Sequence, residues 1–418
     1  MRAARLALLG VAALLAACAE KDTQPPSELT EFTSTADIER VWSASLSDNQ
    51  PRLRLGLGVA SAGESVFAAS NGGTVAGWNA ADGRRLWRTE TRLTLTGGPG
   101  AGENLVVVGG DDGDIVALDA ATGETKWKSR INSEILSAPY IAGGTVLLRA
   151  VDGRLVALRA SDGTQIWSAE EEVPRLSLRG TSRPLISGDL ALAGFDNGRV
   201  LALQLSDGNN RWEVNIAPPA GRSELERMVD IDTALVSDGQ DIYVVTYQGR
   251  AARLERETGE AVWTREISSY SGLAVDDAGV YVSTADGAVV KLDRLQNGVE
   301  SWRQEALARR RLSPPAVLGP LVAVADLQGY VHFLDKSTGA LAARLHPLGN
   351  RVSEPPVVVG DVMVMMDADG KIAALRIKAI GEEASGARVR GSGGGSGGGG
   401  GVSETPANRT PGRTRPGL

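Results

Sequence analysis

The sequence predicts an all-β protein, an eight-bladed β-propeller of four-stranded antiparallel blades. Three observations lead to this prediction. A motif that is clearest at residues 117–127 recurs about every 40 residues, a second turn precedes each copy by about ten residues, and short apolar runs separate the turns. A period near 40 residues with two turns per unit is typical of radial repetition, with four short strands in each unit.

Each repeat is marked by a Gly that is followed four residues later by a Trp. The pairs are Gly83/Trp87, Gly123/Trp127, Gly163/Trp167, Gly208/Trp212, Gly259/Trp263 and Gly298/Trp302. Gly339 continues the series, but Ala343 stands where the Trp is expected. Counting Ala343 as the last position, the spacings are 40, 40, 45, 51, 39 and 41 residues. The two long spacings identify units that carry insertions.

A second turn signal, such as Asp152-Gly153, lies between apolar runs in every unit. Asp-Gly favours a type I′ hairpin, because both central residues of that turn need positive φ. In the third unit we expect strands at 138–141, 146–150, 155–159 and 165–168. Residues 155–158 are apolar without alternation, as expected of a strand that is covered on both faces.

The two ends of the repeat array complete one another. The last unit has Asp369-Gly370 and a third strand near 372–375, but no Trp strand follows. Val41-Trp42-Ser43 is a Trp strand without a strand set ahead of it. Pairing the two segments closes the ring and removes open sheet edges. Counting Trp42, we therefore expect eight blades with the ring closed by the N-terminal strand.

Residues 1–17 have the pattern of a lipoprotein signal peptide, with Arg2 and Arg5, an apolar stretch at 6–15 and small residues before Cys18. Cys18 is the only cysteine and is the expected lipidation site. A plain secretory signal with an incidental Cys is the alternative. In bacterial lipoproteins an Asp after the Cys usually retains the protein at the inner membrane, and Ala19 follows here. The expected location is the outer membrane, with the lipid anchor on the periplasmic side.

Four regions are therefore expected along the chain: the signal peptide at 1–17, the lipidated Cys and a flexible tether at 18–37, the propeller at 38–380, and a tail at 381–418. The tail is rich in Gly, Ser, Pro and Arg and has no apolar periodicity, so we expect it to be disordered.

Few residues suggest chemistry. A net charge of −7 does not favour nucleic-acid binding. His332 and His346 are the only histidines, and their spacing suggests structural or surface roles. The Asp-Gly pairs recur at one position of the repeat, which is the behaviour of turns. We expect no catalytic, metal or cofactor site, and hence no enzyme.

Two units are lengthened between the Trp strand and the first strand of the next blade, by five and eleven residues. In four-stranded antiparallel blades both connections leave the ring on the same face, so the two loops can form one patch. The first loop contains Leu176-Ser177-Leu178-Arg179-Gly180, and the second contains Asp230-Ile231-Asp232. Apolar anchors beside an Arg, with carboxylates nearby, favour a protein–protein contact. Alternatively, the leucines pack onto the rim and the charges are solvated.

Together, the lipoprotein signal, the tether, the eight blades and the two loops resemble the BamB family of the outer-membrane β-barrel assembly machinery. The resemblance covers about residues 1–377 and is most distinctive at 176–180 and at the Glu-x-x-Arg-x-x-Asp-x-Asp pattern of 224–232. It implies a non-enzymatic scaffold that assists assembly and insertion of outer-membrane β-barrel proteins. The implied partner is the set of POTRA domains of BamA, docked through Leu176, Leu178, Arg179, Asp230 and Asp232.

A second resemblance gives the alternative function. The pattern Ala-x-Asp-x-x-Thr-Gly-x-x-x-Trp is similar to the Trp-docking motif of quinoprotein alcohol dehydrogenases, in which the Trp packs between blades. That family also carries paired adjacent cysteines beside its quinone (PQQ-type) cofactor, and this chain, with one Cys, cannot supply them. Unfolded outer-membrane clients could also pair with an edge strand, although no residue locates such a site.

Overall fold

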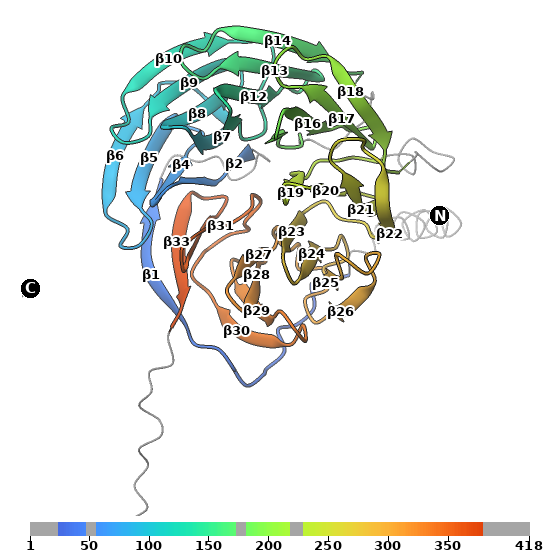
Figure 1. The fold of residues 1–418 in the computed structure, drawn as a ribbon. Helices are drawn as coiled ribbons and strands as arrows, with labels where there is room; N and C mark the ends of the chain where they lie inside the picture. The colour runs from blue at the N-terminus through green and yellow to red at the C-terminus, as the bar shows by residue number, and fades with distance from the viewer. Residues whose placement is uncertain (1–23, 47–55, 173–180, 218–228, 379–418) are drawn as a thin grey trace, which may run out of the picture. The chain divides into compact units, whose positions relative to one another are not determined.

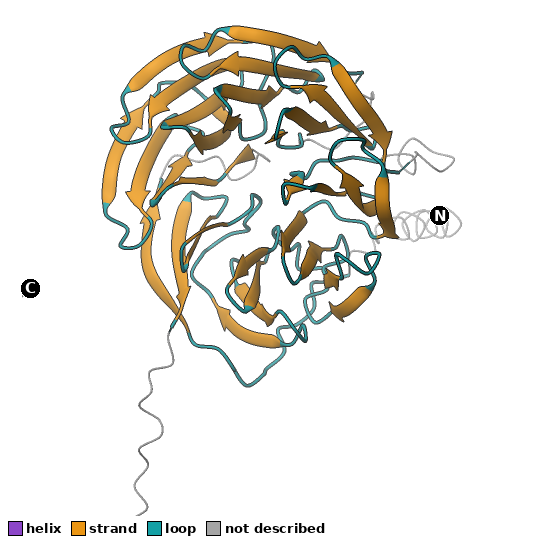
Figure 2. Cartoon of the chain, viewed as in Figure 1, coloured by secondary structure: helices purple, strands orange, loops and turns teal. Residues whose placement is uncertain are grey.

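The computed structural model describes residues 24–46, 56–172, 181–217 and 229–378. These residues form an all-strand ring of eight four-stranded antiparallel blades, which confirms the predicted fold (Figures 1 and 2). The first strand of each blade lies innermost and the fourth outermost. Within this part of the chain, no helix is long and apolar enough to cross a membrane.

Blades 1 to 4 follow one another in sequence. Their strands are β3 (Val59–Ala62), β4 (Ser65–Ala69), β5 (Thr74–Asn79) and β6 (Arg85–Glu90); β7 (Leu95–Gly102), β8 (Leu105–Gly110), β9 (Asp114–Asp119) and β10 (Thr125–Arg130); β11 (Tyr140–Ala142), β12 (Thr145–Arg149), β13 (Arg154–Arg159) and β14 (Gln165–Glu170); and β15 (Leu185–Ser187), β16 (Leu190–Gly194), β17 (Arg199–Gln204) and β18 (Asn210–Asn215). A short strand, β2 (Gly56–Leu57), adds in parallel to β7.

Blades 5 to 8 complete the ring. Their strands are β19 (Val236–Ser237), β20 (Asp241–Val245), β21 (Arg250–Glu255) and β22 (Ala261–Glu266); β23 (Gly272–Asp276), β24 (Gly279–Ser283), β25 (Val289–Leu292) and β26 (Glu300–Gln304); β27 (Ala316–Leu318), β28 (Leu321–Ala325), β29 (Val331–Asp335) and β30 (Leu341–Leu345); and β31 (Val357–Val359), β32 (Val362–Met366), β33 (Lys371–Ile377) and β1 (Ile38–Ser45).

The N-terminal strand closes the ring, as the sequence predicts. β1 pairs antiparallel with β33, from Ile38 opposite Ile377 to Ser45 opposite Lys371. The closing strand also brings Trp42, whose indole Nε1–H donates to the Ala80 carbonyl of blade 1 at 2.8 Å. The chain ends are therefore joined both by a β ladder and by a blade-to-blade contact.

The hydrophobic core is divided into eight layers, one between each pair of neighbouring blades. The layer between blades 2 and 3, for example, joins Val107 and Ile115 to Val146 and Val156 around Trp127. This arrangement explains the non-alternating apolar strands, because both faces of each blade are buried.

The repeated Trp and Gly meet across these layers. Trp127 of blade 2 donates its Nε1–H to the Ala160 carbonyl of blade 3 at 2.8 Å. Its ring lies on Gly163, where a Cβ atom would be 2.4 Å from Trp127 Cε3 and where φ is 73°. The position therefore excludes side chains for two reasons. The same contact joins seven of the eight neighbouring pairs: Trp42 with Gly83, Trp87 with Gly123, Trp127 with Gly163, Trp167 with Gly208, Trp212 with Gly259, Trp263 with Gly298, and Trp302 with Gly339.

The Asp of the motif shapes the turn that receives the Trp. Asp119 Oδ1 accepts hydrogen bonds from the backbone N–H groups of Ala121 at 2.9 Å and Thr122 at 3.0 Å. Gly123 then donates to the Asp119 carbonyl at 2.8 Å. An Asx-type turn of this kind explains why the repeat reads Asp-x-x-Thr-Gly.

The Asp-Gly hairpins differ from the predicted type I′ turn. In blade 3, Gly153 N donates to the Ala150 carbonyl at 3.2 Å and Gly153 has φ of 98°, whereas Asp152 does not have a positive φ. The hairpin is thus a type I turn followed by a glycine bulge, a three-residue loop. The type I′ prediction was wrong because Asp-Gly is compatible with both turns, and the strand twist selects between them.

Residues 24–37 also differ from the prediction, which placed a flexible tether over 18–37. They lie along the outside of blade 7, and Thr35 N and Ala36 N donate to the Ala342 carbonyl at 2.9 and 3.2 Å. The prediction missed this because the segment has no apolar periodicity; it is held through its backbone and by arginine side chains far away in sequence. Cys18, the signal peptide and the tail at 381–418 lie outside the described residues.

Candidate functional site

The two lengthened connections join β14 to β15 and β18 to β19, as the repeat spacing predicts. Connections between blades share one face of the ring with the hairpins between second and third strands, and we call this the connection face. Leu176, Leu178 and Arg179 lie outside the described residues, as do the middle parts of both loops. The described ends of the loops, residues 171–172, 181–184, 216–217 and 229–235, define where the predicted patch is rooted.

Asp230 and Asp232 belong to the returning end of the second loop. Ile231 between them is fully buried, and its Cγ2 would be 2.3 Å from a Cβ at Gly194. Asp230 is 1% exposed, and its carbonyl accepts from Tyr247 N at 2.9 Å. Asp232 is half-buried and lines a cavity at the centre of the ring. Of the two predicted carboxylates, Asp230 is thus enclosed by protein and Asp232 borders internal space.

Between blades 3 and 4 lies a buried ion pair that sequence reasoning missed. Arg149, at the end of β12, is 1% exposed and lies with Nη2 3.7 Å from Oδ1 of Asp196. Its guanidinium stacks on Phe195 at 4.1 Å and donates through Nη1 to the Ala150 carbonyl at 2.6 Å. A charged residue at the end of the apolar run 146–148 was the available signal, because such strands are otherwise apolar.

The carboxylates around Arg149 come from the described ends of both loops and from the hairpins of blades 3 and 4. Burial lowers the pKa of Arg149, while the carboxylates of Asp196, Asp152, Asp232 and Glu171 act in the opposite direction. Glu171 and Asp232 flank the described ends of the first and second loops respectively. The described ends of the two loops therefore each place one carboxylate close enough to act on Arg149, although Glu171 and Asp232 are 61 positions apart in the sequence.

At the centre of the ring lies a cavity of about 200 Å³, lined by inner strands and connections of all eight blades. Polar side chains here include Arg183, Asp232 and Glu354. The Arg183 guanidinium lies 5.4 Å from the centroid of the Tyr140 ring, and burial lowers its pKa. One cationic and two anionic side chains therefore line the wall of this cavity.

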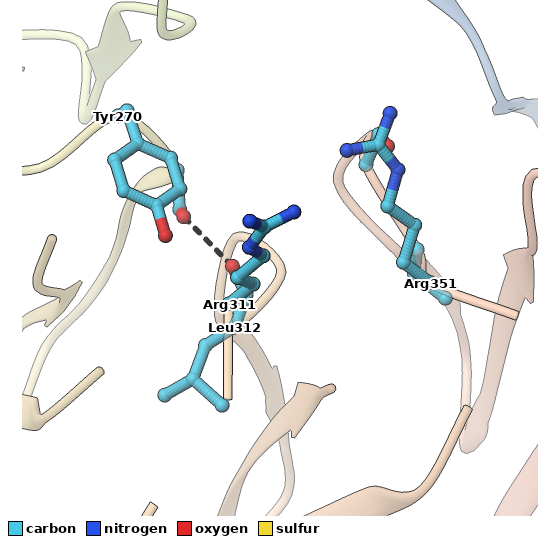
Figure 3. Close-up of a pocket in the computed structure, with 7 residues that line it drawn as sticks. Tyr270, Arg311, Leu312 and Arg351 are labelled. Carbon is cyan, nitrogen blue, oxygen red and sulfur yellow. Dashed lines mark hydrogen bonds between the residues drawn. The ribbon is translucent and has the colours of Figure 1, made fainter. Parts of the chain in front are cut away.

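A second cavity, of about 310 Å³, lies on the connection side of blades 6 to 8 (Figure 3). Tyr270 lines it on one side, and Arg311 and Arg351 extend into it from two other connections. Ser271 Oγ donates to the Leu312 carbonyl at 2.7 Å and ties two of these connections together. Tyr270 and Ser271 also line the central cavity, so the two spaces adjoin.

The two histidines lie together in blade 7. His332 is fully buried and bonded to Asp326, whereas His346 is exposed and stacks on Tyr330 at 4.1 Å. Both have structural partners, in agreement with the roles expected from the sequence. Among the described residues, no group of three or more His, Cys, Asp or Glu side chains could hold a metal ion.

The chain is similar to known proteins both in sequence and in structure. The profile of the family described as "Outer membrane protein assembly factor BamB" matches residues 33–94, 71–304 and 285–384. The BamB of Pseudomonas aeruginosa is 46% identical over 375 residues, covering 89% of this chain and 98% of that protein. The BamB of Alkalilimnicola ehrlichii is 44% identical over 378 residues, covering 90% of this chain and 98% of that protein.

Among solved structures, BamB from Moraxella catarrhalis superimposes with a TM-score of 0.73 at 27% identity, covering 82% of this chain and 100% of that one. The quinohemoprotein alcohol dehydrogenase of Comamonas testosteroni superimposes with a TM-score of 0.64 at 13% identity, covering 82% of this chain and 77% of that one. At that identity the second likeness concerns the fold alone.

Proposed function

The chain belongs to the BamB family of outer membrane protein assembly factors, and on that premise we propose that it is a scaffold that binds the POTRA domains of BamA. The anchor is a lipid on Cys18, which places the ring on the periplasmic side of the outer membrane. The observation that carries the proposal is the 46% identity to an assembly factor across 98% of its length. For a member of this family we expect a role in assembly and no catalytic activity.

The patch proposed for BamA comprises Leu176, Leu178 and Arg179 of the first loop, with Asp232 and the buried Asp230 at the root of the second. Support comes from the described loop ends, because Glu171 of the first and Asp232 of the second both act on the buried Arg149, which pairs with Asp196. We assign Asp230 a supporting role at the root of the second loop, because it is buried.

A quinone-dependent dehydrogenase is the alternative on the same fold. The relatives that span the whole ring at 44–46% identity are named as assembly factors, whereas the dehydrogenase likeness is at 13% identity. The difference in identity favours the assembly role.

The proposal is tested by the affinity of the unlipidated chain, residues 19–418, for the periplasmic region of BamA. We expect Arg179→Glu to weaken binding at least tenfold, about 1.4 kcal/mol, because reversal of a charge at an interface centre leaves its partner unpaired. Isothermal titration calorimetry measures the change.

A matched control reverses a charge on the opposite face. Arg159 is exposed at the end of β13, beside the turn of 160–164, and Arg159→Glu should bind like the parent chain. Equal binding by all three proteins would show that BamA contacts another surface of the ring. If the parent chain itself does not bind while its ring is folded, BamA is the wrong partner.

A further inference from the structure

The N-terminal segment is attached to blade 7 at both ends of that blade's outer strand. Figure 1 shows this segment, in blue, passing outside β30 before it enters β1. Near one end of β30, Thr35 N and Ala36 N donate to the Ala342 carbonyl. Near the other, Arg344 Nη1 donates to the Thr30 carbonyl at 3.1 Å and the Arg344 guanidinium lies 5.0 Å from the Phe32 ring. The segment thus runs alongside the outer strand of blade 7.

The far end of the segment is bound by the connection between β26 and β27. Ser27 N donates to the Ala308 carbonyl at 3.0 Å, and Ser27 Oγ donates to the Ala306 carbonyl at 2.9 Å. Arg309 Nε donates to the Pro25 carbonyl and Arg310 Nη1 to the Ser27 carbonyl, both at 2.8 Å. Four hydrogen bonds therefore hold residues 25–27 on the connection face.

The receiving arginine is built into the ring. Arg310 is 3% exposed and pairs through Nε with Oδ2 of the fully buried Asp326 at 2.7 Å. Its neighbours Arg309 and Arg311 have φ of 59° and 50°, in the left-handed region that costs non-glycine residues energy. A connection held in such a conformation, around a buried ion pair, presents the Arg310 guanidinium to the segment in a fixed position.

The two ends of the segment lie on opposite faces of the ring. β1 begins at Ile38, where the Asp37 carbonyl accepts from Lys378 N just beyond β33, and it ends at Ser45. The next residue, Leu46, donates its N–H to the Gly370 carbonyl of a hairpin on the connection face. A chain that left the ring directly from Ile38 would therefore leave on the face opposite to the connections. Residues 25–36 instead carry it along blade 7 to the connection face.

We propose that residues 25–36 are a docked strap that places the exit of the N-terminal anchor on the connection face, beside blades 6 and 7. The lipid surface is then the partner of that side of the ring, and the anchor and the BamA-binding loops share one face. From Cys18 to Pro25 the chain reaches at most about 25 Å, whereas from Cys18 to Ile38 it would reach about 65 Å. The strap therefore also shortens the tether. The membrane consequence rests on the proposed anchor at Cys18.

The strap is tested by distance measurements that need neither lipid nor BamA. In the chain of residues 18–418, Cys18 is the only thiol and carries one nitroxide label. A second label is placed by Glu305→Cys, on the connection face, or by Leu295→Cys, on the opposite face; the two exposed positions flank β26. Electron–electron double resonance should find Cys18 nearer to position 305 than to position 295.

Release of the strap should remove that difference. Ser27→Pro deletes two of the four hydrogen bonds, those that Ser27 N and Oγ donate, and changes no residue of the ring, so both distance distributions should broaden and their means converge. Thr33→Pro is the matched control, since Thr33 is exposed and its N–H makes no hydrogen bond to the described residues. Equal distances in the parent chain, or a difference that survives Ser27→Pro, would overturn the proposal. Failure of the protein to bind BamA would not contradict the strap proposal, because these distances are measured without BamA.

Discussion

His332, fully buried in β29, has different partners at its two ring nitrogens. Arg344 Nε donates to Nδ1 at 3.2 Å, and Nε2 lies 3.0 Å from Oδ2 of Asp326. Because an arginine can only donate, Nδ1 accepts, and the ring proton sits on Nε2 and points at Asp326. The neutral ring satisfies both neighbours, whereas a second proton would face the Arg344 guanidinium.

Burial lowers the pKa of His332, with the charges of Arg344 and Arg310 adding to the effect and Asp326 opposing it. A lowered pKa in the folded state means that the unfolded chain takes up the proton first as pH falls. We therefore expect the free energy of unfolding to decrease between pH 7 and pH 5, by at most about 1.4 kcal/mol per pH unit from this group. Urea titrations at several pH values measure the slope.

The slope should be smaller in His332→Gln, which removes the titrating ring. His346→Gln is the matched control, since His346 is the only other histidine and is exposed. Keeping the series above pH 5 avoids the titration of Asp326, whose pKa is itself lowered. An unchanged slope in His332→Gln would contradict the role given to this ring.

At the scale of elements, blade 7 departs from the repeat for a reason that lies in blade 8. In the other seven layers a Trp docks on the Gly turn between the third and fourth strands of the next blade. In blade 8 those strands are β33 and β1, the two ends of the ring, so no such turn joins them. Ala343 stands at the Trp position, is 3% exposed, and belongs to the core layer that Ala36 of the strap also covers.

Ala343→Trp should therefore destabilise the protein, although it restores the consensus of the repeat. Without a receiving turn the ring would overpack this layer, at a cost of about 1–3 kcal/mol in the free energy of unfolding. The reverse change one blade earlier, Trp302→Ala, should cost about 3–5 kcal/mol, since Gly339 and the Lys336 carbonyl receive that indole. Chemical denaturation measures the free energy of unfolding of both variants and of the parent chain. Stabilisation by Ala343→Trp would show that blade 8 does offer a site for the Trp.

For the whole molecule, the ring depends on one ladder between residues that are more than 300 positions apart. β1 supplies the fourth strand of blade 8 and, through Trp42, the contact with blade 1. Without β1, the edge of β33 would be open and the layer between blades 8 and 1 would lose its indole. Open apolar edges pair with other chains.

Removing β1 should therefore open the ring. We expect a chain of residues 47–378 to form oligomers or aggregates and to unfold at lower denaturant concentration than a chain of residues 38–378. Light scattering and urea denaturation make the comparison. The longer chain keeps β1 but lacks the strap, so a difference between the two chains reports on ring closure by β1 and not on docking of the strap. A monomeric 47–378 chain of unchanged stability would contradict the closure argument.

Much of this architecture could be predicted from the sequence because the signals are local. The Gly and Trp of each motif are four residues apart, and each hairpin turn lies next to the strands that it joins. Their repetition determines the number of blades, the closing strand and the packing of Trp between blades. The turn type was mispredicted because Asp-Gly fits two hairpins, and only the twist of the assembled blade separates them.

The candidate site was less predictable. The insertions identify which connections are long, but Arg149 and Asp196 come from different blades, and no spacing links them. Asp230 was expected in a surface patch and is buried, because Ile231 fits against Gly194 and draws the backbone into the ring.

The ring, its eight blades and the face that carries the long connections could be inferred from the sequence, because the repeat and its turns are local patterns of neighbouring residues. The course of residues 24–37 and the positions of the buried charges depend on contacts between distant parts of the chain. Arg310 and Ser27 are 283 positions apart, and their hydrogen bond joins a guanidinium to a backbone carbonyl. Since every residue has such a carbonyl, the side-chain pattern of the strap carries no sign of the contact, which exists only once the ring has placed Arg310 beside it.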